Sequence, residues 1–278
     1  MSEALVNRIL PFSSVDGPGN RTVIFFQGCN FNCLYCHNPE TINKCTDCGL
    51  CLSVCPAGAL SSKASKVSWD SGSCVRCDAC LSACRSKSSP KAVFMTVEEV
   101  MEEINRVRPF ISGITVSGGE CMLQKEFLFE LFKRAHEQGL TVFVDTNGSI
   151  DFSKEQALTE TMDMVMLDIK SFDNEEHIML TGMSNENVLK NAGYLAGLDK
   201  LYEVRTVIVP GLLDNQRNVA EISRMIAELN PEIRYKLISF RPLGVIEEMK
   251  NTPVPSAELM EELKTMAENN GCRSVIVV

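Results

Sequence analysis

The chain has 278 residues, 45% of them hydrophobic and 23% charged, which is typical of one large α/β domain or of such a domain with a small insertion. Its formal charge of −9 argues against binding to nucleic acid or to an anionic membrane through a broad positively charged surface. No apolar run is long enough to span a bilayer, and the first residues lack the layout of a signal peptide. We therefore expect a soluble, cytoplasmic protein.

Outside the cysteine-rich stretch of residues 44–90, short apolar runs alternate with amphipathic stretches. The apolar runs predict strands at Thr22–Phe26, Gly113–Ser117, Leu140–Val144, Met164–Leu167, Tyr202–Val209, Arg234–Ser239 and Cys272–Val278. The amphipathic stretches predict helices at Thr96–Val107, Gln124–Gln138, Lys154–Thr161, Glu186–Gly197, Asn215–Leu229 and Ser256–Asn269. This alternation predicts an α/β fold with a parallel sheet, either a full or partial TIM-like barrel or an open, doubly wound sheet, with the working groups at the carboxyl ends of the strands.

Local signals mark several helix ends. Capping-box patterns stand at two predicted helix starts, Thr96-x-x-Glu99 and Ser153-x-x-Gln156. Gly139 and Gly271 occupy positions where C-terminal caps are expected.

The thirteen cysteines are concentrated, because eleven of them lie between Cys29 and Cys84. A core of this size needs no disulfide staples, and a reducing cytosol does not favour them. We therefore expect metal or redox chemistry. The two remaining cysteines, Cys121 and Cys272, are expected to be small buried side chains, although Cys121 lies near the presumed site and an ancillary role stays open.

Residues 29–36 read C-N-F-N-C-L-Y-C and place three thiols just after a predicted strand. A [4Fe–4S] cube needs four ligands, so Cys29, Cys33 and Cys36 leave one corner for another molecule. The alternative is a zinc site completed by His37 or by a distant cysteine.

This triad, with Tyr35 before its last cysteine, resembles that of the radical S-adenosylmethionine (SAM) superfamily. More narrowly, S-V-D-G-P-G-N-R at residues 14–21 resembles the glycyl-radical enzyme activating enzymes. S-G-G-E (117–120), D-T-N-G (145–148), M-L-D-I-K (166–170) and V-R-T-V-I-V-P-G (204–211) follow in the order of that family. Within that family, the local sequence of these motifs is most similar to the YjjW-type branch. The resemblance implies a partial (β/α)6 TIM-like barrel over residues 1–43 and 91–278.

Residues 44–90 are expected to form a bacterial ferredoxin-like insert, because residues 45–56 and 74–84 both contain C-x2-C-x2-C-x3-C. In that pattern the fourth cysteine of each run binds the other cube. One [4Fe–4S] cluster is then assigned to Cys45, Cys48, Cys51 and Cys84, and the second to Cys55, Cys74, Cys77 and Cys80. Zinc is the alternative, although zinc ribbons use two C-x2-C pairs. Arg85 replaces the second proline of the pattern.

The resemblance also implies a SAM site. Its candidate residues are Tyr35, Gly118, Gly119, Glu120, Asp168, Lys170, Arg205, Val207 and Arg241. We expect the two glycines to let backbone approach the ligand and Glu120 to accept from an ammonium group. Asp168 and Lys170 share one side of a strand and can present opposite charges to the methionine end of SAM. Ordinary ion pairs, or a plain turn at S-G-G-E, are the alternatives.

Two further sets of residues are carried over from the family. Asp145, Thr146 and Met166 match a monovalent-cation site, for Na+ or K+, beside the methionine carboxylate. The residues expected near the glycine loop of a partner are Asp16, Gly17, Pro18, Gly19, Arg21 and His37, although D-G-P-G alone would be read as a turn. Arg241 stands where many activating enzymes carry a histidine.

The implied reaction is reductive cleavage of SAM to methionine and a 5′-deoxyadenosyl radical, which abstracts hydrogen from a backbone glycine of a partner glycyl-radical enzyme. No side chain need act as an acid or base. We expect three [4Fe–4S] clusters, an electron donor such as flavodoxin or ferredoxin, and a monomer from an anaerobic bacterium. The insert would relay electrons, or be structural, or dock the partner. A radical enzyme acting on a small molecule or RNA base, or a multi-cluster electron carrier, are the other function classes.

Overall fold

A nine-stranded sheet forms the centre of the computed structural model, which describes residues 2–278. The strands of this sheet are β1 (Glu3–Ser13), β2 (Arg21–Phe26), β5 (Val93–Thr96), β6 (Gly113–Gly118), β7 (Thr141–Thr146), β8 (Met164–Asp168), β9 (Leu201–Ile208), β10 (Arg234–Ser239) and β11 (Val275–Val277). Their order is β11-β10-β9-β8-β7-β6-β2-β1-β5. All pairings from β2 to β11 are parallel, whereas β1 runs antiparallel to both β2 and β5.

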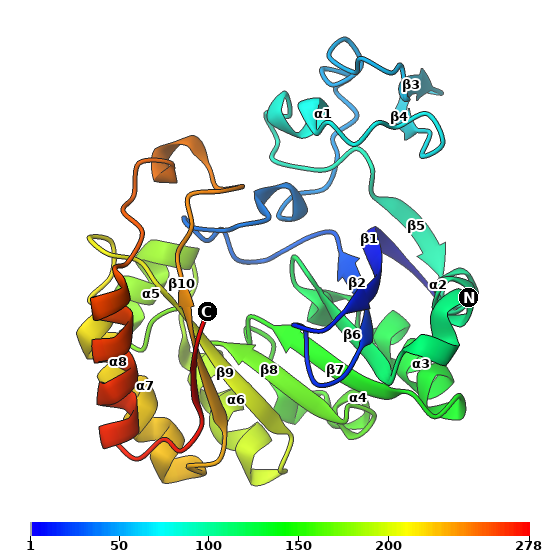
Figure 1. Ribbon diagram of the computed structural model, residues 1–278. Coiled ribbons are helices and arrows are strands. Elements are labelled where there is room, and N and C mark those ends of the chain that lie inside the picture. The colour runs from blue at the N-terminus through cyan, green and yellow to red at the C-terminus, as the bar shows by residue number, and fades with distance from the viewer. Residues whose placement is uncertain (1) are drawn as a thin grey trace.

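The sheet curls into a partial barrel whose outer face carries the helices (Figure 1). These helices are α2 (Val97–Val107), α3 (Lys125–Glu137), α4 (Gln156–Glu160), α5 (Asn174–Thr181), α6 (Glu186–Gly197), α7 (Asn215–Leu229) and α8 (Ala257–Asn269). Alternation along β6 explains the two faces, because Ile114 and Val116 belong to the main core. Thr115 and Ser117 instead form hydrogen bonds to Arg21 and Asp145 on the inner side.

The predicted α/β barrel with a parallel sheet is therefore confirmed, and each predicted strand and helix overlaps an observed one. The capping box at Thr96 is also present, since its hydroxyl accepts from the Glu99 N–H at 3.2 Å and Glu99 accepts from the Thr96 N–H at 2.7 Å. Gly139 and Gly271 follow helix ends with positive φ values of 67° and 108°.

The capping box predicted at Ser153 is wrong. Asp151 accepts hydrogen bonds from Ser153 and starts a short 3-10 turn at Phe152–Lys154. Helix α4 begins only at Gln156, without a side-chain cap. The Ser153 hydroxyl donates to Asp151, so Asp151 rather than Ser153 supplies the N-terminal cap of this segment.

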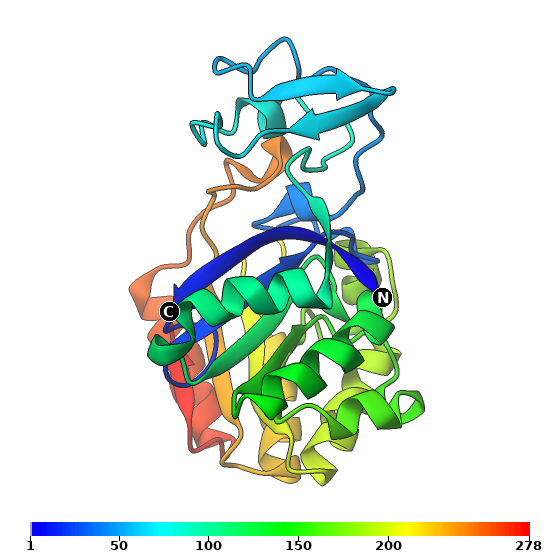
Figure 2. The same ribbon diagram turned by 90° about the vertical axis from the view of Figure 1, so that its right-hand side faces the viewer.

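Residues 44–90 form a separate lobe above the barrel, joined to it through the chain before β5 (Figures 1 and 2). The lobe contains the hairpin β3 (Leu60–Lys63) and β4 (Lys66–Trp69) and the short helix α1 (Ala79–Ser82). Its apolar core is small and is centred on Cys51, Leu60 and Cys80. A core of this size gives little hydrophobic stabilisation by itself. Among residues 2–278, no helix is long and apolar enough to cross a membrane.

Candidate active site at the carboxyl end of the barrel

The loop that follows β2 carries the three predicted cluster cysteines. Its base closes on itself, since the Gly28 N–H donates to the Thr41 carbonyl at 2.8 Å and the Cys29 N–H to the Ile42 carbonyl at 2.9 Å. Its middle is pinned to the end of α5, where the Leu34 N–H donates to the Leu180 carbonyl at 3.0 Å. The fold therefore fixes this loop at the carboxyl end of a central strand, where parallel sheets place functional groups.

Cys29, Cys33 and Cys36 are free thiols and half-buried. Burial raises the pKa of Cys29 to about 12 and that of Cys33 to about 11. The positive charge of Lys170 lowers the pKa of Cys33, and the negative charge of Asp168 raises it. Thiols with raised pKa values become ligands when a metal displaces their protons. Three such thiols at one loop suit an iron–sulfur cluster with one open corner.

The two glycines of S-G-G-E let the chain pack closely against itself, and their expected approach to a ligand stays a prediction. A Cβ on Gly118 would lie 2.2 Å from the Phe26 nitrogen, and one on Gly119 would lie 2.2 Å from the Gly28 carbonyl oxygen. Gly118 also has a φ of 120°, which L side chains rarely adopt. Glycine at both positions lets the end of β6 lie against the base of the cysteine loop.

Glu120 makes several hydrogen bonds within the chain. Its carboxylate accepts from the Met122 N–H at 2.9 Å, from the Thr146 hydroxyl at 2.8 Å and from the Asn147 N–H at 2.7 Å. The residue is 1% exposed, and burial raises its pKa to about 7. This carboxylate holds the loop after β7, and a contact with a ligand ammonium stays a prediction.

Charged side chains of β7, β9 and β10 meet inside the barrel. Arg205 lies 3.0 Å from the Asp145 carboxylate and 2.5 Å from that of Glu203. Burial would lower the pKa of Arg205, but the two carboxylates raise it above its usual value. Glu203, 1% exposed, also pairs with Arg234 and Lys236. The alternative of a buried, ion-paired Arg205 is what the structure shows.

The predicted cation set is split between two environments. Asp145 and Met166 both contact Arg205, with the Met166 sulfur 2.8 Å from a guanidinium nitrogen. Thr146, on the opposite face of β7, turns to Glu120. The structure therefore does not bring the three side chains together, and a cation site there stays a prediction.

Asp168 and Lys170 form an ion pair of 2.6 Å beside the cysteine loop. Burial would lower the pKa of Lys170, but the Asp168 charge raises it well above its usual value. Tyr35 lies in a second apolar cluster with Val207 and Phe240 and is 2% exposed. Its hydroxyl has no hydrogen-bond partner within the described chain, so a polar ligand beside it would satisfy an orphaned donor.

Arg21 is wrong as a partner-binding residue, because it is 1% exposed. Its guanidinium donates to the Ile114 carbonyl at 2.6 Å and to the Thr115 hydroxyl at 2.9 Å, and it lies 4.2 Å from the Phe143 ring centre. Burial lowers its pKa to about 10. It anchors the Gly-rich bend of residues 16–19 from below, through a hydrogen bond to the Pro18 carbonyl.

The other predicted partner residues have different neighbours. The Asp16 carbonyl accepts from Thr115 at 2.6 Å on the inner face of β6, while Pro18 and Gly19 are exposed. His37 instead contacts the loop after β10, where its Nε2 lies 3.0 Å from the Arg241 carbonyl oxygen. The Arg241 side chain is exposed, and burial lowers the pKa of His37.

The eight cysteines of the lobe surround two separate hollows. One is lined by Cys45, Cys48, Cys51 and Cys84. The other is lined by Cys55, Cys74, Cys77 and Cys80. These are the two sets that the crossed C-x2-C-x2-C-x3-C pattern predicts. No three His, Cys, Asp or Glu side chains of residues 2–278 converge tightly enough to hold a single ion.

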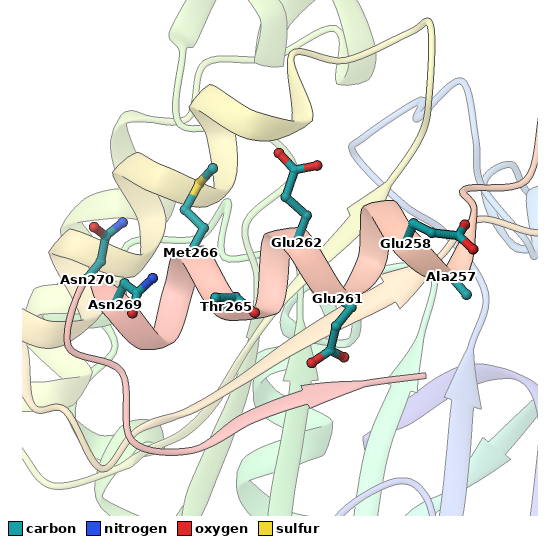
Figure 3. A pocket seen from close by; sticks show the side chains of 8 residues that line it. All are labelled: Ala257, Glu258, Glu261, Glu262, Thr265, Met266, Asn269 and Asn270. Atoms are coloured by element: carbon teal, nitrogen blue, oxygen red, sulfur yellow. The ribbon is translucent and has the colours of Figure 1, made fainter.

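Two features lie outside this site. Cys121 and Cys272 are buried, as predicted, at 0% and 3% exposure. A wide hollow of about 860 Å³ lies over α8, where Glu258, Glu261 and Glu262 project in different directions from one helix (Figure 3). It is remote in sequence from every predicted cluster cysteine, and it contains none of the predicted site residues.

Sequence reasoning missed Glu203 and Asn147. Glu203 could have been found from its spacing, because Glu203 and Arg205 are two residues apart on β9 and therefore face the same side of it. Asn147 carries no charge and sits in a loop, so only the folded contacts reveal that its amide nitrogen lies 3.7 Å from the Cys29 sulfur.

A partial α/β barrel with a three-cysteine loop at the carboxyl end of β2 defines the class of enzyme, and comparison with known proteins agrees. The family model described as Radical SAM superfamily matches residues 23–222. The indoleacetate decarboxylase activating enzyme of Tractidigestivibacter scatoligenes is 31% identical over 99% of this chain and 97% of its own. The pyruvate formate-lyase 1-activating enzyme of Escherichia coli K12 is 31% identical over 96% and 98%.

A solved domain of a pyruvate-formate lyase-activating enzyme from Bacteroides vulgatus has the same fold. It superposes with a TM-score of 0.52 at 24% identity, and covers 60% of this chain and 99% of that one. The chain belongs to the radical SAM superfamily and, within it, to the glycyl-radical enzyme activating enzymes.

Proposed function

We propose that this chain generates a radical from SAM at the loop of residues 29–36 and uses it to abstract hydrogen from one backbone glycine of a partner glycyl-radical enzyme. The observation that carries the proposal is the placement of three free thiols at the carboxyl end of β2, beside the Asp168–Lys170 pair. Both named relatives match nearly the whole chain, and both are activating enzymes.

The residues of the loop fit a cluster, so Cys29, Cys33 and Cys36 would hold a [4Fe–4S] group with one open corner. When bound, that group supplies the electron that cleaves the S–C5′ bond of SAM. The chain itself binds and orients the substrate. Lys170 offers a positive charge to the carboxylate of SAM, and Asp168 offers a negative charge to its amino group. The buried Tyr35 hydroxyl offers a hydrogen-bond donor. The surrounding apolar cluster excludes water.

We further propose that the lobe of residues 44–90 is a ferredoxin-type insert holding two more [4Fe–4S] clusters, and that it places the chain in the corresponding subtype. The support is the division of eight cysteines between two hollows. Cys48 and Cys77 are exposed, so each hollow has a ligand at the surface where a flavodoxin or ferredoxin could deliver electrons. The lobe would then relay these electrons toward the cysteine loop.

Anaerobic reconstitution tests the main proposal. Full-length protein with iron, sulfide, dithionite and SAM is expected to release methionine and 5′-deoxyadenosine, and Cys33→Ala is expected to abolish both products. With a candidate glycyl-radical enzyme, mixing should give a glycyl-radical EPR signal. Failure of the reconstituted wild-type protein to cleave SAM would refute the proposal.

The relay has its own test. Cys48→Ala and Cys77→Ala are expected to slow SAM cleavage when flavodoxin or ferredoxin supplies the electron, but not when a small reductant does. Equal rates of the variants and the wild type with the protein donor would exclude a relay and leave a structural or docking role for the lobe.

A further inference from the structure

We infer that Asn147 is a positioning residue that donates a hydrogen bond from its side-chain amide to the Cys29 sulfur and raises the reduction potential of the cluster held there. The inference rests on the proposed function, because it requires the cluster at Cys29, Cys33 and Cys36. Asn147 lies in the loop after β7, and its Nδ2 is 3.7 Å from the Cys29 sulfur. Sulfur acceptors form hydrogen bonds at such longer distances because the atom is large.

The orientation of the amide follows from its other contacts. The Ser149 N–H donates to Asn147 Oδ1 at 2.9 Å, so the oxygen must face Ser149. Nδ2 is then the end that faces Cys29, and its second hydrogen reaches Asn30 Oδ1 at 3.2 Å. Asn30 is oriented in turn, because its own amide nitrogen donates to the Ser149 hydroxyl at 2.8 Å. A flipped amide would set Nδ2 against the Ser149 N–H and Oδ1 against Asn30 Oδ1 and the Cys29 sulfur, and all three hydrogen bonds would be lost.

The backbone of Asn147 is held as firmly as its side chain. Its N–H donates to Glu120 Oε2 at 2.7 Å, and Glu120 is fixed by Met122 and Thr146. Asn147 is 7% exposed, so water competes little for its amide. This arrangement gives Glu120 a role that its sequence motif does not suggest: it positions the donor to a cluster ligand.

A donor to a cluster thiolate favours the more negative, reduced state over the oxidised state. The Asn147 contact is therefore expected to make the cluster easier to reduce. Reduction is the demanding step for a site that must deliver one electron to a sulfonium. The amide is buried and neutral, so it has this effect without changing the formal charge of −9.

An EPR-monitored redox titration of the full-length, reconstituted protein tests the inference. The component to follow is the signal that changes when SAM is added, because that response distinguishes the site cluster from those of the lobe. We expect Asn147→Leu to lower its midpoint potential. At the wild-type midpoint, the ratio of reduced to oxidised cluster should fall about tenfold, which is 59 mV for one electron.

Asn187→Leu is the matched control, since it makes the same substitution beside this loop, at an exposed residue that donates to the Ser149 carbonyl at 2.8 Å. It is expected to leave the potential unchanged. Asn147→Ala provides a second variant if the leucine disturbs assembly, because it removes the donor to sulfur without adding bulk or charge. It should also lower the potential.

The outcomes separate the inference from the proposed function. Wild-type potential in an Asn147 variant with full iron content overturns the role of Asn147 and leaves the activating function standing. A wild-type protein with no SAM-responsive signal overturns both. An equal fall in Asn187→Leu would also overturn the inference, since the effect would then belong to the loop rather than to the amide donor.

Discussion

The ammonium nitrogen of Lys170 lies 5.9 Å from the centre of the Tyr35 ring, and the Tyr35 hydroxyl has no hydrogen-bond partner within residues 2–278. Tyr35 is 2% exposed, so the ligand-free protein buries this hydroxyl unpaired. Such burial costs about 1–3 kcal/mol, and it is tolerated where a ligand later supplies the partner.

Tyr35→Phe is therefore expected to raise the free energy of unfolding of the SAM-free protein by about 1 kcal/mol, because it removes the unsatisfied group. The same change should weaken SAM binding. Anaerobic denaturant unfolding and calorimetric SAM titration measure the two effects. A variant that is less stable without SAM would show that the hydroxyl already has a partner, and the proposed ligand contact would fail.

Glu120 gives stability a pH dependence. Its pKa is about 7 in the folded protein, against an ordinary value of 4.5, so the folded state binds more protons than the unfolded state between these values. The contribution of Glu120 is thus largest below about pH 4.5, declines as pH rises to about 7, and is constant above. The stability difference between wild type and Glu120→Gln should follow this course in unfolding measured from pH 5 to 8. A pH-independent difference would contradict the raised pKa.

The barrel could be predicted from the sequence because the spacing of the apolar residues and the helix caps agree along most of the chain. It missed β1, where bulges at residues 6–8 and 10–13 interrupt the alternation. It also missed α5, although Asp173 caps its start and Gly182, with a φ of 82°, follows its end. The apolar pattern of α5 is weak, because Ile178 and Met179 are both exposed. Tertiary contacts, rather than local periodicity, hold these two elements.

The cluster cysteines were accessible to sequence reasoning because ligand spacing is a local property of the chain. The roles of Gly118, Glu120 and Arg21 were not, because each depends on which distant backbone it meets. Glycine and carboxylate in a motif suggested a ligand, yet Gly118 accommodates β2 and Glu120 accepts from the loop after β7. A motif identifies residues that the fold requires, and only the packing tells whether they touch substrate.

The Arg205 ion pairs predict a specific pattern of destabilisation. Arg205→Met leaves Asp145 without its cation, whereas Glu203 keeps Arg234 and Lys236. Breaking a buried pair in this way costs about 3–5 kcal/mol. Adding Asp145→Asn to Arg205→Met should recover part of that loss, because the uncompensated charge is removed. Denaturant unfolding of both variants measures the recovery, and a double variant as unstable as Arg205→Met would assign the loss to packing instead.

Alanine at Gly118 or Gly119 is expected to be strongly destabilising, because the added methyl group would collide with backbone atoms. A methyl group at Gly119 would meet the Gly28 and Thr41 carbonyls at 2.2 and 2.8 Å, and neither backbone can move without opening the base of the cysteine loop.

Gly119→Ala should therefore unfold the loop, lower the iron content after reconstitution, and reduce the melting temperature. Gly193→Ala is the matched control, since Gly193 lies within α6 and a methyl group there would have no neighbouring atom within 4 Å. That change should stabilise the protein by about 0.5–1 kcal/mol, as alanine does inside helices. If Gly119→Ala retained both iron and wild-type stability, the close backbone approach could not be the reason for glycine at this position.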